Sequence, residues 1–95
     1  MTDIFTVIIS KRAQFDLSKV PKHILIKLLA WVSDVEENGL MATRKIPGYH
    51  DEPLHGIRFG QRSVRLSKAY RAIYLIKNDK VIDFINIQEL SKHDY

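Results

Sequence analysis

One segment of the sequence has the pattern of a long amphipathic helix, and it constrains the fold more than any other feature. Pro21 suits the first position of a helix, and Gly39 is well placed to end it. Between them, apolar side chains recur at helical spacing, at Ile24, Leu25, Leu28, Leu29, Trp31, Val32 and Val35. A helix with so wide an apolar face needs a second layer of structure to cover it.

Segments on both sides of this helix have the composition of β-strands. Residues 4–10 are β-branched and aromatic, residues 61–67 alternate apolar with polar, and residues 70–77 and 80–88 flank an Asn78-Asp79 turn. Residues 11–20 form a weaker helical stretch, and residues 40–60 are rich in glycine and proline, which predicts an irregular loop. The expected order is β-α-α-β-β-β. We therefore predict an α+β fold, a helical hairpin packed on a small, mostly antiparallel sheet, in one domain spanning residues 1–95.

The composition fits a protein that folds in a reducing compartment. Of the 95 residues, 45% are hydrophobic, which permits a buried core, and none is cysteine, which excludes disulfides and thiolate metal sites. The first ten residues lack the positive charge and apolar length of a signal peptide, and no stretch is long enough to span a membrane. We expect a soluble cytoplasmic protein without a membrane partner.

A basic, acid-free stretch near the end of the chain points to an anionic partner. Five cations lie between residues 58 and 71, namely Arg58, Arg62, Arg65, Lys68 and Arg71. Such a stretch suits nucleic acid, and it also suits a solvated strand edge that resists aggregation. Arg65 alternates with Val64 and Leu66, so it projects from the open face of the sheet if those two face the helices. Arg71 shares its face with apolar residues, which leaves its direction open.

The chemical groups of the sequence favour metal-free chemistry. His50, Asp51, Glu52 and His55 are close in sequence but match no recurring metal-binding pattern, so we expect no metal and no cofactor. Arginine, histidine, tyrosine and carboxylate suffice to cleave RNA, because the substrate's own 2′-hydroxyl attacks its phosphorus. The protein then needs to position the phosphate, neutralise its charge and move protons.

Residues 48–76 (GYHDEPLHGIRFGQRSVRLSKAYRAIYLI) and the terminal KHDY resemble the RelE/ParE superfamily of bacterial toxins. The similarity extends over essentially the whole chain and is closest to the RelE-like branch, with its YafQ- and HigB-like members. The resemblance implies a helical pair on a twisted antiparallel sheet, as the strand order also predicts. It further implies a type II toxin–antitoxin toxin, a metal-independent endonuclease that cuts mRNA in the ribosomal A site.

The resemblance also implies roles for individual residues. Arg71 matches the family's phosphate-binding arginine, and Arg65 matches a catalytic Arg or His on the adjacent strand. His93 and Tyr95 match a basic or histidine residue and a tyrosine near the end of the family's chains. Glu52 stands where one branch has a catalytic loop histidine, so either Glu52 acts as an acid or base, or this role of the loop is lost and His50 or His55 substitutes. The residues expected to contact RNA are Arg58, Arg62, Lys68, Lys92 and His50.

We expect an mRNA endonuclease that inhibits translation, with a cognate antitoxin and the mRNA-loaded ribosome as partners. The toxin–antitoxin complex would also bind operator DNA. Two alternatives stay open: a ParE-like inhibitor of DNA gyrase, and an inactive module that binds the antitoxin or regulates the operator. The histidine near the C-terminus argues against the gyrase inhibitor, because binding alone needs no acid–base group.

Overall fold

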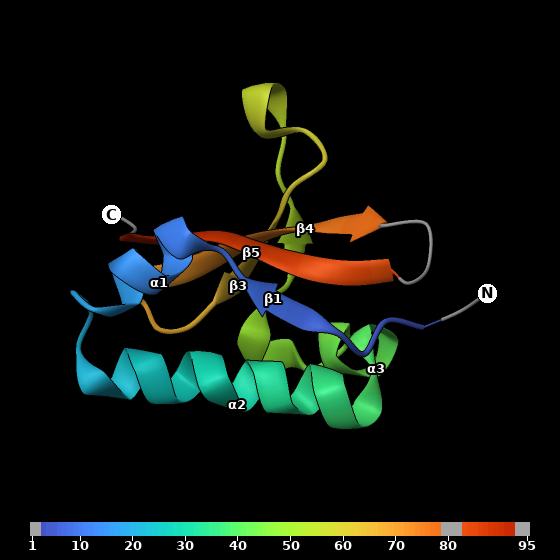
Figure 1. The fold of residues 1–95 in the computed structure, drawn as a ribbon, viewed down its shortest axis with the longest axis horizontal. Helices are drawn as coiled ribbons and strands as arrows, with labels where there is room; N and C mark the ends of the chain where they lie inside the picture. Colours follow the sequence, from blue (N-terminus) through green and yellow to red (C-terminus); the bar gives the residue numbers. More distant parts are fainter. Residues whose placement is uncertain (1–2, 79–82, 93–95) are drawn as a thin grey trace.

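A mixed β-sheet forms the centre of the computed structural model, which describes residues 3–78 and 83–92 (Figure 1). Within these residues the sheet has five strands in the order β1-β5-β4-β3-β2. They are β1 (Val7–Ile9), β2 (Glu52–Pro53), β3 (Arg62–Arg65), β4 (Tyr70–Asn78) and β5 (Asp83–Lys92). Strand β1 runs parallel to β5, and every other neighbouring pair is antiparallel. The first strand in the sequence therefore lies beside the last.

Three α-helices and two short 3₁₀ helices connect the described strands. They are α1 (Lys11–Leu17), α2 (Lys22–Asn38), α3 (Leu40–Arg44), η1 (Pro47–Tyr49) and η2 (Gly56–Arg58). Helix α1 begins where the Ser10 hydroxyl accepts the backbone N–H of Ala13 at 3.0 Å. Helix α2 lies along one side of the sheet, and α3 follows it at the same level (Figure 1).

Gly39 ends α2 in a conformation that other residues rarely adopt. Its φ is +88°, and a Cβ built on it would collide with the carboxylate of Asp3. The Asp3 carboxylate instead accepts the backbone N–H groups of Ile4 and Met41. The glycine thus lets the chain turn sharply from α2 into α3 while the N-terminal segment packs closely against the turn.

The hydrophobic core lies between α2 and the sheet. Ile24, Leu28, Trp31 and Val35 are buried on one face of the helix, as the apolar spacing predicts. The sheet and the turn after β3 contribute a matching set of buried side chains, namely Val64, Leu66, Ala72, Tyr74 and Leu90. The rings of Trp31 and Tyr74 meet with their centroids 5.3 Å apart. Burying each large apolar side chain stabilises the fold by about 1.5–3 kcal/mol.

The predicted α+β fold class is confirmed, and the structure adds elements that the sequence pattern did not indicate. The stretch at residues 40–60, predicted to be an irregular loop, contains α3, η1, β2 and η2. The segment between β2 and β3, which carries η2, projects away from the sheet (Figure 1). Pro21 precedes the first helical residue instead of occupying it. Two of these short elements matter for the candidate site, because β2 contains Glu52 and η1 ends just before His50.

Candidate functional site

Two arginines lie opposite each other on neighbouring strands. In the register of β3 and β4, Arg65 pairs with Arg71, and on its other side Arg71 pairs with Ser91 of β5. Directly opposed residues on one face have Cβ atoms about 4.5–5.5 Å apart. Like charges directly opposite each other on two strands are unfavourable by themselves. An anion bound between the two guanidinium groups would offset that repulsion.

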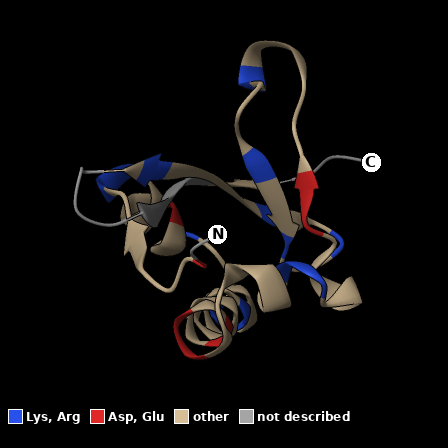
Figure 2. Cartoon of the chain, turned by 90° about the vertical axis from the view of Figure 1, so that its right-hand side faces the viewer, with Lys and Arg blue, Asp and Glu red and all other residues tan. Residues whose placement is uncertain are grey.

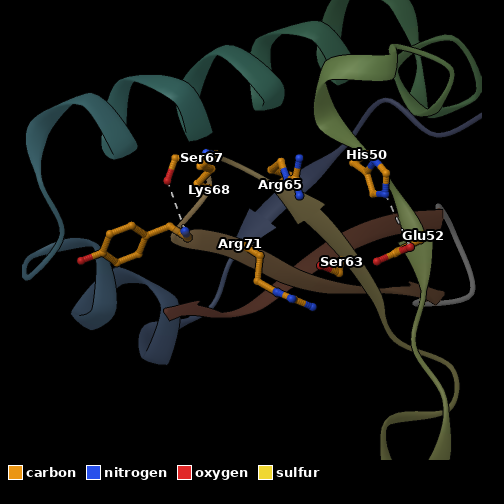
Figure 3. Close-up of a pocket in the computed structure, with 8 residues that line it drawn as sticks. His50, Glu52, Ser63, Arg65, Ser67, Lys68 and Arg71 are labelled. Carbon is orange, nitrogen blue, oxygen red and sulfur yellow. Dashed lines mark hydrogen bonds and ion pairs between the residues drawn. The ribbon is translucent and has the colours of Figure 1, made fainter. Parts of the chain in front are cut away.

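The two arginines border a polar pocket of about 250 Å³ (Figure 3). Its other lining residues are His50, Glu52, Ser63, Ser67, Lys68 and Tyr70. Three of the lining side chains are cationic when histidine is neutral, and one is a carboxylate. The pocket therefore has the charge and hydrogen-bonding groups to hold a phosphate.

A tight turn between β3 and β4 shapes one end of this pocket. The Ser67 hydroxyl accepts the backbone N–H groups of Ala69 and Tyr70, at 3.1 Å and 3.2 Å. The carbonyl of Tyr70 in turn accepts the N–H groups of Leu66 and Ser67. Four hydrogen bonds within five residues hold the turn closed. They fix the backbone positions of Lys68 and Tyr70, whose side chains line the pocket.

His50 and Glu52 close the opposite end of the pocket. His50 has φ +47° and ψ +47°, a left-handed conformation that is uncommon outside glycine. Glu52 starts β2 and pairs with Ser63 of β3, which brings its side chain to the face that carries Arg65. The imidazole Nε2 of His50 lies 3.9 Å from the Glu52 Oε2, as Figure 3 shows. An acid–base pair therefore lies on the pocket wall beside the two arginines.

Asp51, between these two residues, fastens their segment to the sheet. Its side chain is fully buried and accepts hydrogen bonds from Arg62 Nε and from the Tyr74 hydroxyl, both at 2.7 Å. Burial raises the pKa of Tyr74 above its usual range, and the adjacent Asp51 carboxylate raises it further. The hydroxyl is therefore neutral near pH 7 and remains a hydrogen-bond donor.

Comparison with known proteins bears on the fold. No family model and no curated protein matches the chain, whereas solved structures do. YafQ from E. coli is 19% identical with a TM-score of 0.70, and the match covers 92% of this chain and 91% of that one. The toxin–antitoxin complex RelBE2 from Mycobacterium tuberculosis gives 22% identity, a TM-score of 0.66, and coverage of 95% and 99%. The fold is that of RelE-like toxins.

A third structure widens the group that shares this RelE-like fold. The YoeB/ParE toxin from Agrobacterium tumefaciens is 14% identical with a TM-score of 0.67, and the match covers 94% of this chain and 99% of that one. Because one fold can serve several functions, function has to be argued from the residues of the site.

The RelE-like fold brings five of the residues singled out in the sequence to one pocket: His50, Glu52, Arg65, Lys68 and Arg71. Arg65 is exposed, and its neighbours Val64 and Leu66 are buried toward the helices, as the alternation predicts. The direction of Arg71, which the sequence left open, is toward the same pocket. Across the β4–β5 hairpin Arg71 pairs with Ser91, and Asp83 pairs with Asn78 at the opposite end of the two strands.

Other predicted residues lie elsewhere. Arg62 points to the opposite face, where it binds Asp51, and Arg58 lies on the projecting segment with its Nη1 3.1 Å from Gln61 Oε1. The backbone of Lys92 pairs with Tyr70 at the edge of the pocket. His93 and Tyr95 lie outside the described residues. No sequence pattern indicates the structural role of Asp51, because its partners are 11 and 23 positions away and only the folded chain brings them together.

Two further features of the described residues concern metal ions and membranes. Across residues 3–78 and 83–92, no three His, Asp or Glu side chains are grouped so that they could hold a metal ion. No helix in the same ranges has the length and apolar character needed to cross a lipid bilayer.

Proposed function

We propose that this protein is the toxin of a type II toxin–antitoxin system and that it cleaves mRNA bound to the ribosome. The observation that carries the proposal is the pair Arg65 and Arg71, opposed across β3 and β4 in a pocket that also holds an imidazole and a carboxylate. The RelE-like fold supports it, because solved structures with this fold include toxins and toxin–antitoxin complexes. On this proposal residues 1–95 form one toxin domain, which acts in the cytoplasm.

The proposed reaction begins when the scissile phosphate binds between Arg65 and Arg71. A general base removes the proton of the 2′-hydroxyl, the 2′-oxygen forms a bond to phosphorus, and the bond from phosphorus to the 5′-oxygen breaks. The 5′-oxygen leaves with a proton from a general acid, which yields a 2′,3′-cyclic phosphate and a 5′-hydroxyl. Guanidinium groups donate paired hydrogen bonds to the phosphorane oxygens, where negative charge accumulates.

The proton-transfer groups are proposed from two segments. Glu52 and His50 border the pocket and are suited to accept or donate a proton on one side of the phosphate. We propose His93 for the other side, with Tyr95 assisting, because the sequence continues to them directly from Lys92, whose backbone pairs with Tyr70. Lys68 would bind the neighbouring backbone of the RNA. Partners on this proposal are a cognate antitoxin, the mRNA-loaded ribosome and, as a complex, operator DNA.

The test compares growth arrest and mRNA cleavage for single variants. We expect Arg71→Ala to lower the cleavage rate on programmed ribosomes about 10²–10³-fold, the usual effect of removing one donor to a developing oxyanion. Arg71→Lys should recover only part of this, because lysine cannot form the paired hydrogen bonds. Arg12→Ala, on α1 and outside the pocket, is the matched control. If Arg71→Ala cleaves as fast as Arg12→Ala, the proposed site is wrong.

A second candidate function is inhibition of DNA gyrase. The fold match to a structure described as a YoeB/ParE toxin supports it. The two functions differ in their effect on cells: an endonuclease stops translation and leaves cleaved mRNA ends that primer extension detects, whereas a gyrase inhibitor induces the DNA-damage response. Growth arrest with DNA damage and intact mRNA would favour the gyrase inhibitor.

A further inference from the structure

A second pocket of about 310 Å³ adjoins the first one. The two pockets share His50 and Glu52, which therefore stand between them. The far side of the second pocket is formed by the end of α3 and the residues that follow it, namely Arg44, Lys45, Ile46 and Pro47. The wall that carries the proposed acid–base pair thus faces a cavity on each side.

The second pocket has a positive character of its own. Arg44 is half-buried and Lys45 is exposed. Asp51 also lines this pocket, but its carboxylate is fully buried and bound to Arg62, so Glu52 is the accessible acid there. Figure 2 shows several basic segments close to the red strand at the base of the projecting segment, and it shows α2 end-on with both acidic and basic segments. Cations therefore lie on both sides of the His50–Glu52 wall.

We propose that the second pocket binds the phosphate next to the scissile one on the same RNA strand, with Lys45 as the accessible cation that contacts it. This inference rests on the proposed function. A single strand carries one negative charge at every nucleotide, so a strand held at Arg65 and Arg71 presents further phosphates on either side. The exposed Ile46, beside Pro47, supplies an apolar surface against which the adjoining base can lie.

The place of His50 and Glu52 between the two pockets determines which part of a bound RNA strand lies beside them. A strand that occupies both pockets must cross this wall, so the ribose that joins the two phosphates lies beside the imidazole and the carboxylate. Binding at Lys45 then fixes which nucleotide presents its 2′-hydroxyl to the pair. Loss of this contact should lower the apparent affinity for the message more than the rate of the chemical step.

The experiment combines a protein variant with a neutral phosphate. Messages are prepared with one methylphosphonate at the position before or after the cleaved bond, and kcat/KM is measured on programmed ribosomes. We expect Lys45→Ala to lower kcat/KM about two- to fivefold on the normal message, the size expected for an exposed ion pair. On the message in which a methylphosphonate replaces the phosphate that Lys45 contacts, Lys45→Ala and the parent should have the same kcat/KM.

Lys22→Ala is the matched control, because Lys22 is exposed at the start of α2 and borders neither pocket. The inference fails if Lys45→Ala matches Lys22→Ala on the normal message. It also fails if Lys45→Ala lowers kcat/KM by the same factor on both methylphosphonate messages as on the normal message, because the two changes would then be independent. Failure of the proposed function looks different: the parent protein would then leave the normal message uncut. Lys45→Arg, which keeps the charge, should retain most of the parent's kcat/KM on the normal message.

Discussion

The buried carboxylate of Asp51 allows a quantitative prediction about stability. The side chain has no exposed surface, and the Arg62 side chain that binds it is 22% exposed. Removing one partner of a buried ion pair destabilises a protein by about 3–5 kcal/mol. Asn at position 51 keeps one oxygen that can accept a hydrogen bond, so we expect Asp51→Asn to lower the free energy of unfolding by about 3 kcal/mol, the lower end of that range.

This loss should be large in thermal unfolding. For a domain of this size, 1 kcal/mol corresponds to a change in melting temperature of roughly 4–8 °C, so the melting temperature should fall by roughly 12–24 °C. Tyr74→Phe removes one of the two hydrogen bonds to the carboxylate and should cost about 1.5–3 kcal/mol. Both values are measured by urea unfolding and by circular dichroism on heating.

Asp34→Asn is the matched control, because Asp34 also accepts a tyrosine hydrogen bond, from Tyr49 at 2.8 Å, but is not fully buried. The double variant Asp51→Asn with Arg62→Met should be more stable than the sum of its two single changes, since neither member of the pair is then left alone. If Asp51→Asn destabilises the protein no more than Asp34→Asn does, the carboxylate does not anchor the segment and this reasoning is wrong.

Three further predictions concern single side chains. Ser67→Ala removes the acceptor that closes the β3–β4 turn, so the free energy of unfolding should fall by about 1 kcal/mol and mRNA cleavage should slow; an unchanged rate would show that the turn does not shape the pocket. Burial, with a hydrogen bond to Asp34, raises the pKa of Tyr49 from 10.0 to about 12. The unfolded chain therefore ionises first, so the contribution of Tyr49 to stability is complete below pH 10 and should be lost as the pH rises toward 12; urea unfolding at each pH should show a smaller fall for Tyr49→Phe. Gly39→Ala forces a side chain into a positive φ and against Asp3, which should cost roughly 1–3 kcal/mol in urea unfolding, and a neutral result would contradict the close approach.

The sequence predicted the parts of the fold that depend on local patterns. Helix α2 and the burial of Val64 and Leu66 follow from spacing of 3.6 and 2 residues, and the exposure of Arg65 follows from the same alternation. The short strand β2 has no such pattern, because two residues cannot show a period. Its place depends on the pairing of Glu52 with Ser63, which only the folded chain reveals.

Arg71 shows a second limit of sequence patterns. Its neighbours Ala72, Ile73 and Tyr74 are all buried, so alternation could not give its direction. The register between β4 and β5 shifts between Ile73 and Tyr74, because β5 carries one extra residue, Gln88, between the partners of these two. The pocket that Arg71 shares with His50 is therefore a property of strand register, and composition alone could not predict it.

The order of the strands has a consequence for how the protein acquires activity. Strand β5 is the last described strand in the sequence, yet it lies inside the sheet between β1 and β4. Val7 of β1 pairs with Ile85 of β5, 78 positions later in the sequence. Because the chain must close so long a loop to form this pair, folding is slow. A growing chain that stops before β5 contains both Arg65 and Arg71, but on a hairpin that is marginally stable without further strands. If the proposed function holds, a ribosome making this protein is exposed to an active product only after the whole sheet can form.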